Sequence, residues 1–310
     1  MIRSFDALES KMSCRPPLRV VVAGADDGTV LQAMNDAAEK GQISAAILVG
    51  AAGDIGRQLP SALGAIAQII DAPQANTCAE KAVAAIRSGA GDVLVKGSVN
   101  SADYLRAVVD KTSGLRCSEV LSNLTLAEMP SLERLIGATD NGIIPAPTLA
   151  QKRAILQNAL PLFAGLGIRC PRVAAIAASE KVTSRQPATT DAAQLAAASR
   201  AGELGNICVD GPFGYDVALS PDAAHRKGLQ DSLVAGRADL ILFPTIEAGN
   251  ATVKAWKLHA AARTASIVLG ASVPVLLNSR SDGVEQRRLG LVLAQAALAG
   301  AGAGIVSQPE

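Results

Sequence analysis

Aromatic side chains are scarce in this sequence: Phe, Trp and Tyr make up 2% of its 310 residues. Because 49% of the residues are hydrophobic, the core must be built from small aliphatic side chains. Charge is limited too, with 18% charged residues and a formal net charge of +1. This balance is typical of a globular chain. It lacks the positive excess that draws proteins to nucleic acid or anionic membranes, so a few placed Lys and Arg residues must hold any anionic ligand.

The sequence has no recognisable disulfide framework, metal motif or leader. Its five cysteines include no CxxC pair, which indicates buried thiols in a reducing cytoplasm. His225 and His259 are far apart and have no metal-ligand spacing, so we expect no metal site. The N-terminal stretch MIRSFDALESKMSC lacks an apolar signal core, and no uncharged apolar run is long enough to cross a bilayer. We therefore expect a capping helix on a cytoplasmic protein without membrane contact.

Apolar strands alternate with helical stretches along the chain, which indicates an α/β fold with doubly wound, mostly parallel sheets. The length suits two domains, and a Pro-rich segment at 141–147 is the predicted crossing point. We assign residues 1–142 and 272–310 to the first domain and 143–271 to the second. The expected strands are 18–23, 45–49, 67–70, 92–96, 119–126, 172–177, 207–210, 238–243, 267–270 and 273–277. The expected helices are 28–40, 79–87, 101–109, 148–160, 192–201, 252–264 and 284–299.

Nucleotide-binding motifs are absent. GADDG at residues 24–28 is the nearest approach to a phosphate turn, but it lacks the GxGxxG spacing. No GxxxxGK[ST] segment is present either. The sequence gives a dinucleotide site little support.

A strand, a polar turn and a long apolar helix follow one another near the C-terminus, in VPVLLNSRSDGVEQRRLGLVLAQAALA. The turn presents Ser279, Arg280 and Asp282 at the N-terminus of that helix, where free backbone N–H groups and the helix dipole favour an anion. Arg280 adds a planar fork of donors. Asp282 with Glu285 also fits a capping box, a purely structural alternative.

Polar residues gather directly after the predicted strands. In an open α/β sheet these loops form the ligand crevice, so five of them are expected to line one interdomain cleft. They carry Lys96 and Ser98, Ser179 to Lys181, Asp210 and Asp216, Glu247 and Asn250, and Ser279 to Asp282.

Each of these residues also has a structural alternative. Lys96 fits a surface lysine at a strand end, and Asp210 before Gly-Pro fits a turn. Arg106 fits a solvated helix charge, and Asn250 fits the cap of the helix that follows it.

Five collinear motifs resemble the phosphate acetyltransferase and phosphate butyryltransferase family: VKGSVNSADYLRAVV, EKVTSRQPATTDAA, VDGPFGYD, FPTIEAGN and VLLNSRSDGVE. The resemblance covers roughly residues 90–300, and VKG and EKV…PATxDA are closer to the butyryl branch. It implies a two-domain fold similar to the isocitrate and isopropylmalate dehydrogenases, usually a homodimer. It implies interconversion of acyl-CoA plus phosphate with acyl phosphate plus CoA. Coenzyme A and inorganic phosphate are then substrates, and no cofactor is bound permanently.

The resemblance places the family's serine and arginine on Ser279 and Arg280. The acetyl branch has its catalytic aspartate further beyond the serine, where this chain has Glu285 and Gln286. Asp282 or Glu285 can serve, and we choose Asp282. The other substrate-binding candidates are Lys96, Ser98, Arg106, Lys181, Asp210, Asp216, Asn250 and Glu285.

The residue chemistry suits this reaction. A thiol with a pKa near ~8.5 must lose its proton to attack, and Asp282 can accept it. Arg280 can hold the departing phosphoryl group, and Ser279 can donate to the oxyanion on the acyl carbon. A covalent acyl-serine has weaker support because no histidine lies near Ser279 and Lys181 is the remaining base candidate. Two alternatives stay open: a dehydrogenase of the same architecture, and a non-catalytic CoA or acyl-phosphate sensor.

Overall fold

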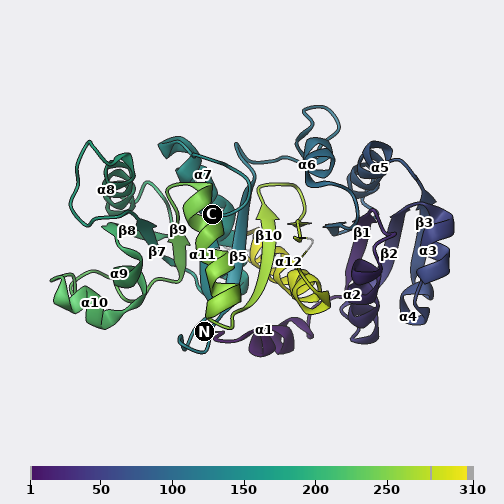
Figure 1. Ribbon diagram of the computed structural model, residues 1–310, viewed down its shortest axis with the longest axis horizontal. Helices are drawn as coiled ribbons and strands as arrows, with labels where there is room; N and C mark the ends of the chain where they lie inside the picture. Colours follow the sequence, from purple (N-terminus) through teal and green to yellow (C-terminus); the bar gives the residue numbers. More distant parts are fainter. Residues whose placement is uncertain (1, 280, 306–310) are drawn as a thin grey trace.

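The computed structural model describes residues 2–279 and 281–305, and its strands form one continuous sheet (Figure 1). Within these residues the sheet has 11 strands, in the order β3-β2-β1-β4-β11-β10-β5-β6-β9-β7-β8. The strands are β1 Leu18–Ala23, β2 Ile43–Gly50, β3 Ala67–Asp71, β4 Val93–Lys96, β5 Ser122–Glu128, β6 Ile136–Thr139, β7 Arg172–Ile176, β8 Cys208–Phe213, β9 Leu240–Leu242, β10 Arg263–Leu269 and β11 Val275–Leu276.

Helices cover both faces of the sheet, which makes a three-layer α/β/α arrangement (Figure 1). One face carries a large core to which α1, α2, α7, α8 and α12 contribute, while α5 and α6, then α9 to α11, cover the other face. The helices are α1 Phe5–Met12, α2 Gly28–Glu39, α3 Ala52–Gln58, α4 Ser61–Gly64, α5 Ala75–Arg87, α6 Ser101–Val109, α7 Leu149–Gly165, α8 Pro187–Arg200, α9 Tyr215–Leu219, α10 Pro221–Arg226, α11 Ile246–His259 and α12 Val284–Ile305.

The direction of the strands changes across the middle of the sheet. β2, β3, β1, β4 and β11 are parallel neighbours, and β10 runs antiparallel to both β11 and β5. β6 then runs antiparallel to β5. From β6 onward the neighbours β6, β9, β7 and β8 are all parallel to one another. The carboxyl ends of β7, β8 and β9 therefore lie at the opposite edge of the sheet from those of β4 and β11.

The expectation of separate sheets is therefore wrong, whereas the mostly parallel α/β class is confirmed. β10 lies in the range assigned to the second domain, yet it pairs with β11 and β5 of the first. The division into two domains stays a prediction.

Most expected elements lie where the sequence placed them. α7 begins with a capping box of Thr148 and Gln151, which supports the helix expected from residue 148. The helix expected at 252–264 instead begins at Ile246 and ends at His259, since the chain turns there into β10. β6 was not expected at all, because it is only four residues long and no alternation of apolar and polar residues marks it.

Small aliphatic residues build the core, as the composition predicts. α12 is mainly apolar from Leu289 onward, and Leu289, Leu291, Val292 and Leu293 are all fully buried. The cysteines differ from expectation: only Cys78 is buried, where burial raises the pKa of its thiol to about 11. The remaining cysteines are exposed or half-buried, because they lie in loops or at the start of an edge strand: Cys14, Cys117, Cys170 and Cys208.

Candidate active site

Three parallel strands, β1, β4 and β11, end at the same edge of the sheet and place three turns side by side. The chain leaves β1 for β2 on one side, whereas β4 and β11 lie on the other. This is the switch point where ligands bind in open α/β sheets. The fully buried Tyr104 links β4 and β11. Its hydroxyl donates to Leu94 O of β4 at 3.0 Å or to Leu276 O of β11 at 3.3 Å.

Two glycines allow the turns after β1 and β4 to touch. Gly97 N donates to Ala23 O and Ser98 N to Gly24 O, each at 2.8 Å. A Cβ on Gly97 would lie 1.9 Å from Gly24 O, so a side chain there would push the turns apart. Gly24 itself has φ +79°, which favours glycine. The approach brings Ser98 Oγ to Asp26 Oδ1 at 2.5 Å.

Asp282 organises the turn after β11. Its Oδ2 accepts from the backbone N–H of Ser279 at 2.9 Å and lies 3.5 Å from Asn278 Nδ2. Its Oδ1 accepts from Lys257 Nζ of α11 at 2.7 Å. The Asp282 side chain is 7% exposed and that of Lys257 29%. This ion pair therefore ties α11 to the turn, and it leaves Ser279 exposed at the tip.

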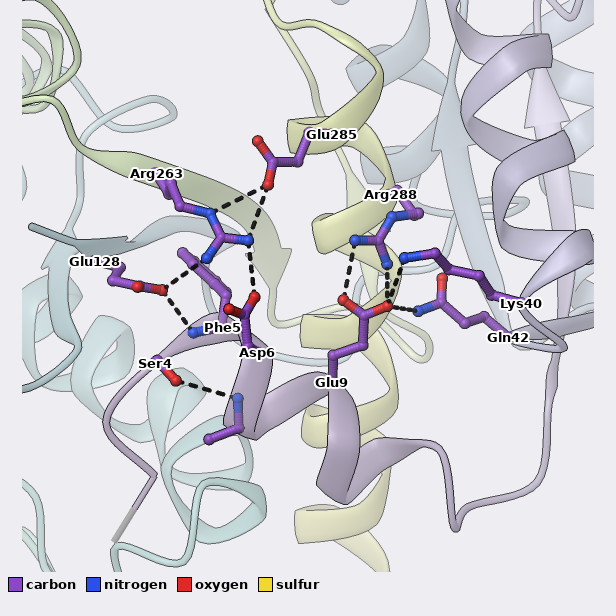
Figure 2. Close-up of polar contacts among 11 residues, drawn as sticks. Ser4, Phe5, Asp6, Glu9, Lys40, Gln42, Glu128, Arg263, Glu285 and Arg288 are labelled. Atoms are coloured by element: carbon purple, nitrogen blue, oxygen red, sulfur yellow. Dashed lines mark hydrogen bonds and ion pairs between the residues drawn. The ribbon is translucent and has the colours of Figure 1, made fainter.

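The structural alternative, a capping box of Asp282 and Glu285, does not match the hydrogen bonds of these two residues. α12 begins at Val284, so Gly283 precedes it directly, and Gly283 N donates to Gln286 Oε1 at 3.0 Å. The Asp282 carboxylate points back into the turn instead. Glu285 accepts from Arg263 at 2.9 and 3.1 Å, with a side chain 49% exposed (Figure 2).

Lys96 is not a surface lysine: it is buried, 5% exposed, with Nζ 3.3 Å from Gly97 O. Its backbone carbonyl lies 3.4 Å from Arg287 Nη1, and Arg287 Nε lies 3.3 Å from Asp282 O. Arg287 Nη2 also faces Asp27 Oδ2 at 3.7 Å. Arg287 thus contacts all three turns, those after β1, β4 and β11.

Sequence reasoning missed Lys257 and Arg287, which hold these turns together. Lys257 lies seven residues after Asn250 on α11, a spacing that places both on one helical face. Arg287 lies in the first turn of the helix that follows the polar turn. This position beside the predicted anion site is the sequence signal that could have identified it.

Asn250 lies inside α11 and does not cap it, because the position before the helix belongs to Thr245. Its Nδ2 donates to Asn141 O at 3.2 Å. Seven residues of helix separate it from Lys257 by about 10 Å. Asn250 therefore lies on the same face of α11 as Lys257, but its side chain forms no hydrogen bond with the described residues of the turn after β11.

The structure places Lys181, Asp210 and Asp216 in other surroundings, near the β8 edge. Asp210 accepts from Ser232 Oγ at 2.6 Å. Asp216 pairs with Lys227 at 3.4 Å, and Lys181 N donates to Ser179 Oγ at 3.0 Å. β8 is six strands from β11, roughly 29 Å at ~4.8 Å per strand. The expected convergence of all five loops is wrong for this chain, because the strand direction reverses between the two groups.

Arg106 lies on the outer face of α6. It pairs with Asp103 at 2.6 Å, and its side chain is 72% exposed. Together with Arg87 and Glu80 it lines a groove of about 520 Å³ between α5 and α6.

Arg280, the predicted phosphate ligand, lies outside the described residues.

The turn after β11 combines an exposed hydroxyl, a fixed carboxylate and nearby cations at the start of a 22-residue helix. Such a set can bind an anion and accept a proton. In the part of the chain that the structure describes, no three His, Cys, Asp or Glu side chains could hold a metal ion. No helix described there combines the length and apolar character that crossing a bilayer requires.

The family model and the curated relatives in the comparisons indicate one family. Residues 72–294 match the family model described as phosphate acetyl/butaryl transferase. Phosphate butyryltransferase of Clostridium acetobutylicum is 37% identical over 297 residues, covering 95% of this chain and 98% of that protein. Phosphate acetyltransferase of Rhizobium meliloti is 34% identical, covering 91% of this chain and 90% of that protein.

Solved structures show the same relationship. The crystal structure of a branched-chain phosphotransacylase from Enterococcus faecalis superposes with a TM-score of 0.80 at 25% identity, covering 90% of this chain and 99% of that one. A phosphotransacetylase from Streptococcus pyogenes, at 19% identity, shares the fold with a TM-score of 0.79 over 95% of this chain and 99% of that one. The chain therefore belongs to the phosphate acetyl/butyryl transferase family, whose members are acyltransferases.

Proposed function

We propose that this protein transfers an acyl group between coenzyme A and inorganic phosphate, at the turn between β11 and α12. The observation that carries the proposal is the Asp282 carboxylate. It binds the Ser279 N–H through one oxygen and Lys257 through the other, inside the region that matches the family. An exposed hydroxyl and a fixed proton acceptor thus lie within one turn, beside a helix N-terminus that favours phosphate.

The transfer proceeds directly between two bound substrates. Toward acyl-CoA, the thiol of CoA loses its proton to Asp282 and its sulfur attacks the carbonyl carbon of the acyl phosphate. The C–S bond forms, the C–O bond to phosphate breaks, and phosphate leaves with the electron pair. A carboxylate offers about four lone pairs, and among the described residues three donors use those of Asp282, so this carboxylate keeps the capacity to accept the thiol proton.

Ser279 and Arg280 complete this proposal. Ser279 Oγ lies at the exposed tip of the turn, 3.0 Å from Ser281 Oγ, and rotates to donate to the oxyanion that forms on the acyl carbon. Arg280, adjacent in the chain, holds the phosphoryl oxygens in a bidentate manner. Lys96 and Lys257 add positive charge beside the same turn.

Finer features of the proposal rest on the family resemblance. The butyryl branch is favoured by the VKG and PATTDA motifs and by relatives named phosphate butyryltransferase at 36–37% identity. CoA and phosphate act as substrates, without a permanently bound cofactor. We further propose two domains per chain, of the isocitrate dehydrogenase type, and a homodimer that works in the cytoplasm.

A thiol-release assay tests the function. Purified protein is mixed with acyl-CoAs of two to six carbons, with and without inorganic phosphate, and free thiol is measured. We expect release that requires phosphate. Release without phosphate would indicate hydrolysis, and CoA binding without release would support a sensor. Nicotinamide reduction with hydroxy acids would instead support the dehydrogenase alternative.

Arg280→Lys should raise the KM for phosphate more than the KM for acyl-CoA. Lysine keeps the charge but lacks the planar fork that grips two phosphate oxygens. Steady-state kinetics with each substrate varied in turn measures the two constants. An unchanged phosphate KM would remove Arg280 from the site.

A further inference from the structure

Ion pairs hold the first turn of α12 on the helix face that carries Glu285 and Arg288. Glu285 and Arg288 are three residues apart, so they lie on one face of the helix. Figure 2 shows this face turned toward α1 and the start of β10. Asp282 precedes these two residues by three and six positions. Any movement of the first turn therefore moves Asp282 and Ser279.

Arg288 makes the first attachment, to Glu9 of α1. Its Nη1 and Nη2 donate to the two carboxylate oxygens at 2.6 and 3.0 Å, a bidentate pair (Figure 2). The Arg288 side chain is 8% exposed and that of Glu9 22%. Lys40 and Gln42 each reach the same carboxylate at 3.1 Å. Burial alone would raise the pKa of Glu9, but Arg288 and Lys40 outweigh it and hold the pKa below its usual value.

Arg263 makes the second attachment, at the start of β10. Its guanidinium donates to Glu285 at 2.9 Å, to Asp6 at 3.0 Å and to Glu128 at 3.3 Å (Figure 2). It also lies over the ring of Phe5, 5.9 Å from the centroid. One cation thus joins α1, β5 and α12.

α1 is itself held firmly against the body of the protein. Phe5, Leu8 and Met12 are at most 1% exposed. Phe5 N donates to Glu128 Oε2 at 2.7 Å, and Lys11 Nζ donates to Gly165 O of α7 at 3.1 Å. The helix can therefore serve as a fixed support.

Stability alone explains this arrangement poorly. A largely buried ion pair is often no better for stability than apolar residues of the same volume. An apolar contact, however, would let α12 slide or turn by small amounts, whereas a bidentate fork fixes both the distance and the orientation of its partner. Displacement of a reacting group by 1 Å can cost about 10²-fold in rate.

We propose that α1 and Arg263 position the catalytic turn, by fixing the first turn of α12 through Arg288 and Glu285. Arg288, Glu9 and Arg263 are positioning residues: none of them forms a hydrogen bond or ion pair with the described residues of the turn, and they act through α12. The inference rests on the proposed acyl transfer at Ser279 and Asp282.

Arg288→Gln tests the proposal, with Arg172→Gln as a matched control. Arg172 makes an equivalent bidentate pair with Asp239, at 2.8 and 2.9 Å, at the amino ends of β7 and β9. Asp239 is only 3% exposed, so the control should lose at least as much thermal stability. Both variants are assayed by phosphate-dependent thiol release, well below the Tm of each.

We expect Arg288→Gln to lower kcat by roughly 10-fold, with the KM for acyl-CoA little changed, while Arg172→Gln keeps kcat within about twofold. Arg288→Lys, which keeps one contact with Glu9, should recover part of the loss. Glu9→Gln is a milder variant in case Arg288→Gln folds poorly, and the two changes combined should be no slower than Arg288→Gln alone.

A wild-type kcat in Arg288→Gln and Glu9→Gln would overturn the inference, as would an equal loss in Arg172→Gln. These results require an active wild-type protein. Wild-type protein without phosphate-dependent thiol release would overturn the proposed function itself, and this inference with it.

Discussion

Replacing Asp282 by asparagine should reduce turnover by ~10² to 10⁴-fold, the loss expected when a general base is removed. Asparagine keeps one oxygen in place, so the Ser279 N–H retains an acceptor. It cannot take the thiol proton. The measurement is the initial rate of acyl-CoA formation from acyl phosphate and CoA, compared with the Tm of the same sample.

Stability should change much less than turnover in this variant. The exchange removes the ion pair between Asp282 and Lys257, and the lysine side chain is 29% exposed and can be solvated. We expect a loss of about 1 kcal/mol in the free energy of unfolding, near the upper end for partly exposed pairs. A cap effect is not expected, because Gly283 rather than Asp282 precedes α12.

Lys257→Gln provides the matched control. It breaks the same ion pair but leaves the carboxylate in the turn, so a general base is retained. Turnover in this variant should exceed that of Asp282→Asn by at least about tenfold. Equal losses in the two variants would mean that the ion pair matters rather than proton transfer. Normal turnover in Asp282→Asn would instead direct attention to Glu285, although that residue faces Arg263.

The first five strands and the helices α2, α5 and α6 were predictable because their signals are local, whereas α3 and α4 were not expected. β1, β4 and α2 each combine a continuous apolar run or a helical period with a turn residue at the end. The start of α11 was not predictable, since PTIEAGN reads as a loop and its first turn has no side-chain cap. β6 is four residues long, too short for any periodicity to show.

Part of the candidate site was predictable for the same reason. Lys96 and Ser279 lie directly after neighbouring parallel strands, so the carboxyl-end rule placed them correctly. The rule failed for Asp210 because it assumes a common strand direction, and the reversal comes from the antiparallel pairs of β10 with β11 and β5. Lys257 could not be assigned, since its contact with Asp282 spans two elements whose packing no local pattern encodes.

Ser279→Ala should reduce kcat by ~10² to 10³-fold, the usual cost of removing one donor to a developing oxyanion. The hydroxyl lies at the exposed tip of the turn, and the backbone N–H of Ser279 keeps its bond to Asp282. The turn should therefore stay in place, with stability within about 0.5 kcal/mol of wild type. Because the donor acts on charge that appears in the transition state, kcat should fall while the KM values change little.

Ser281→Ala is the matched control for this change. Ser281 is exposed in the same turn, and its Oγ lies 3.0 Å from Ser279 Oγ, so both variants lose the same hydroxyl contact. Only Ser279 is assigned to the oxyanion, and Ser281→Ala should keep kcat within a few-fold of wild type. If Ser281→Ala is slower than Ser279→Ala, the oxyanion donor is Ser281. If neither change slows the reaction, the developing charge must be stabilised by backbone N–H groups at the start of α12 rather than by a hydroxyl.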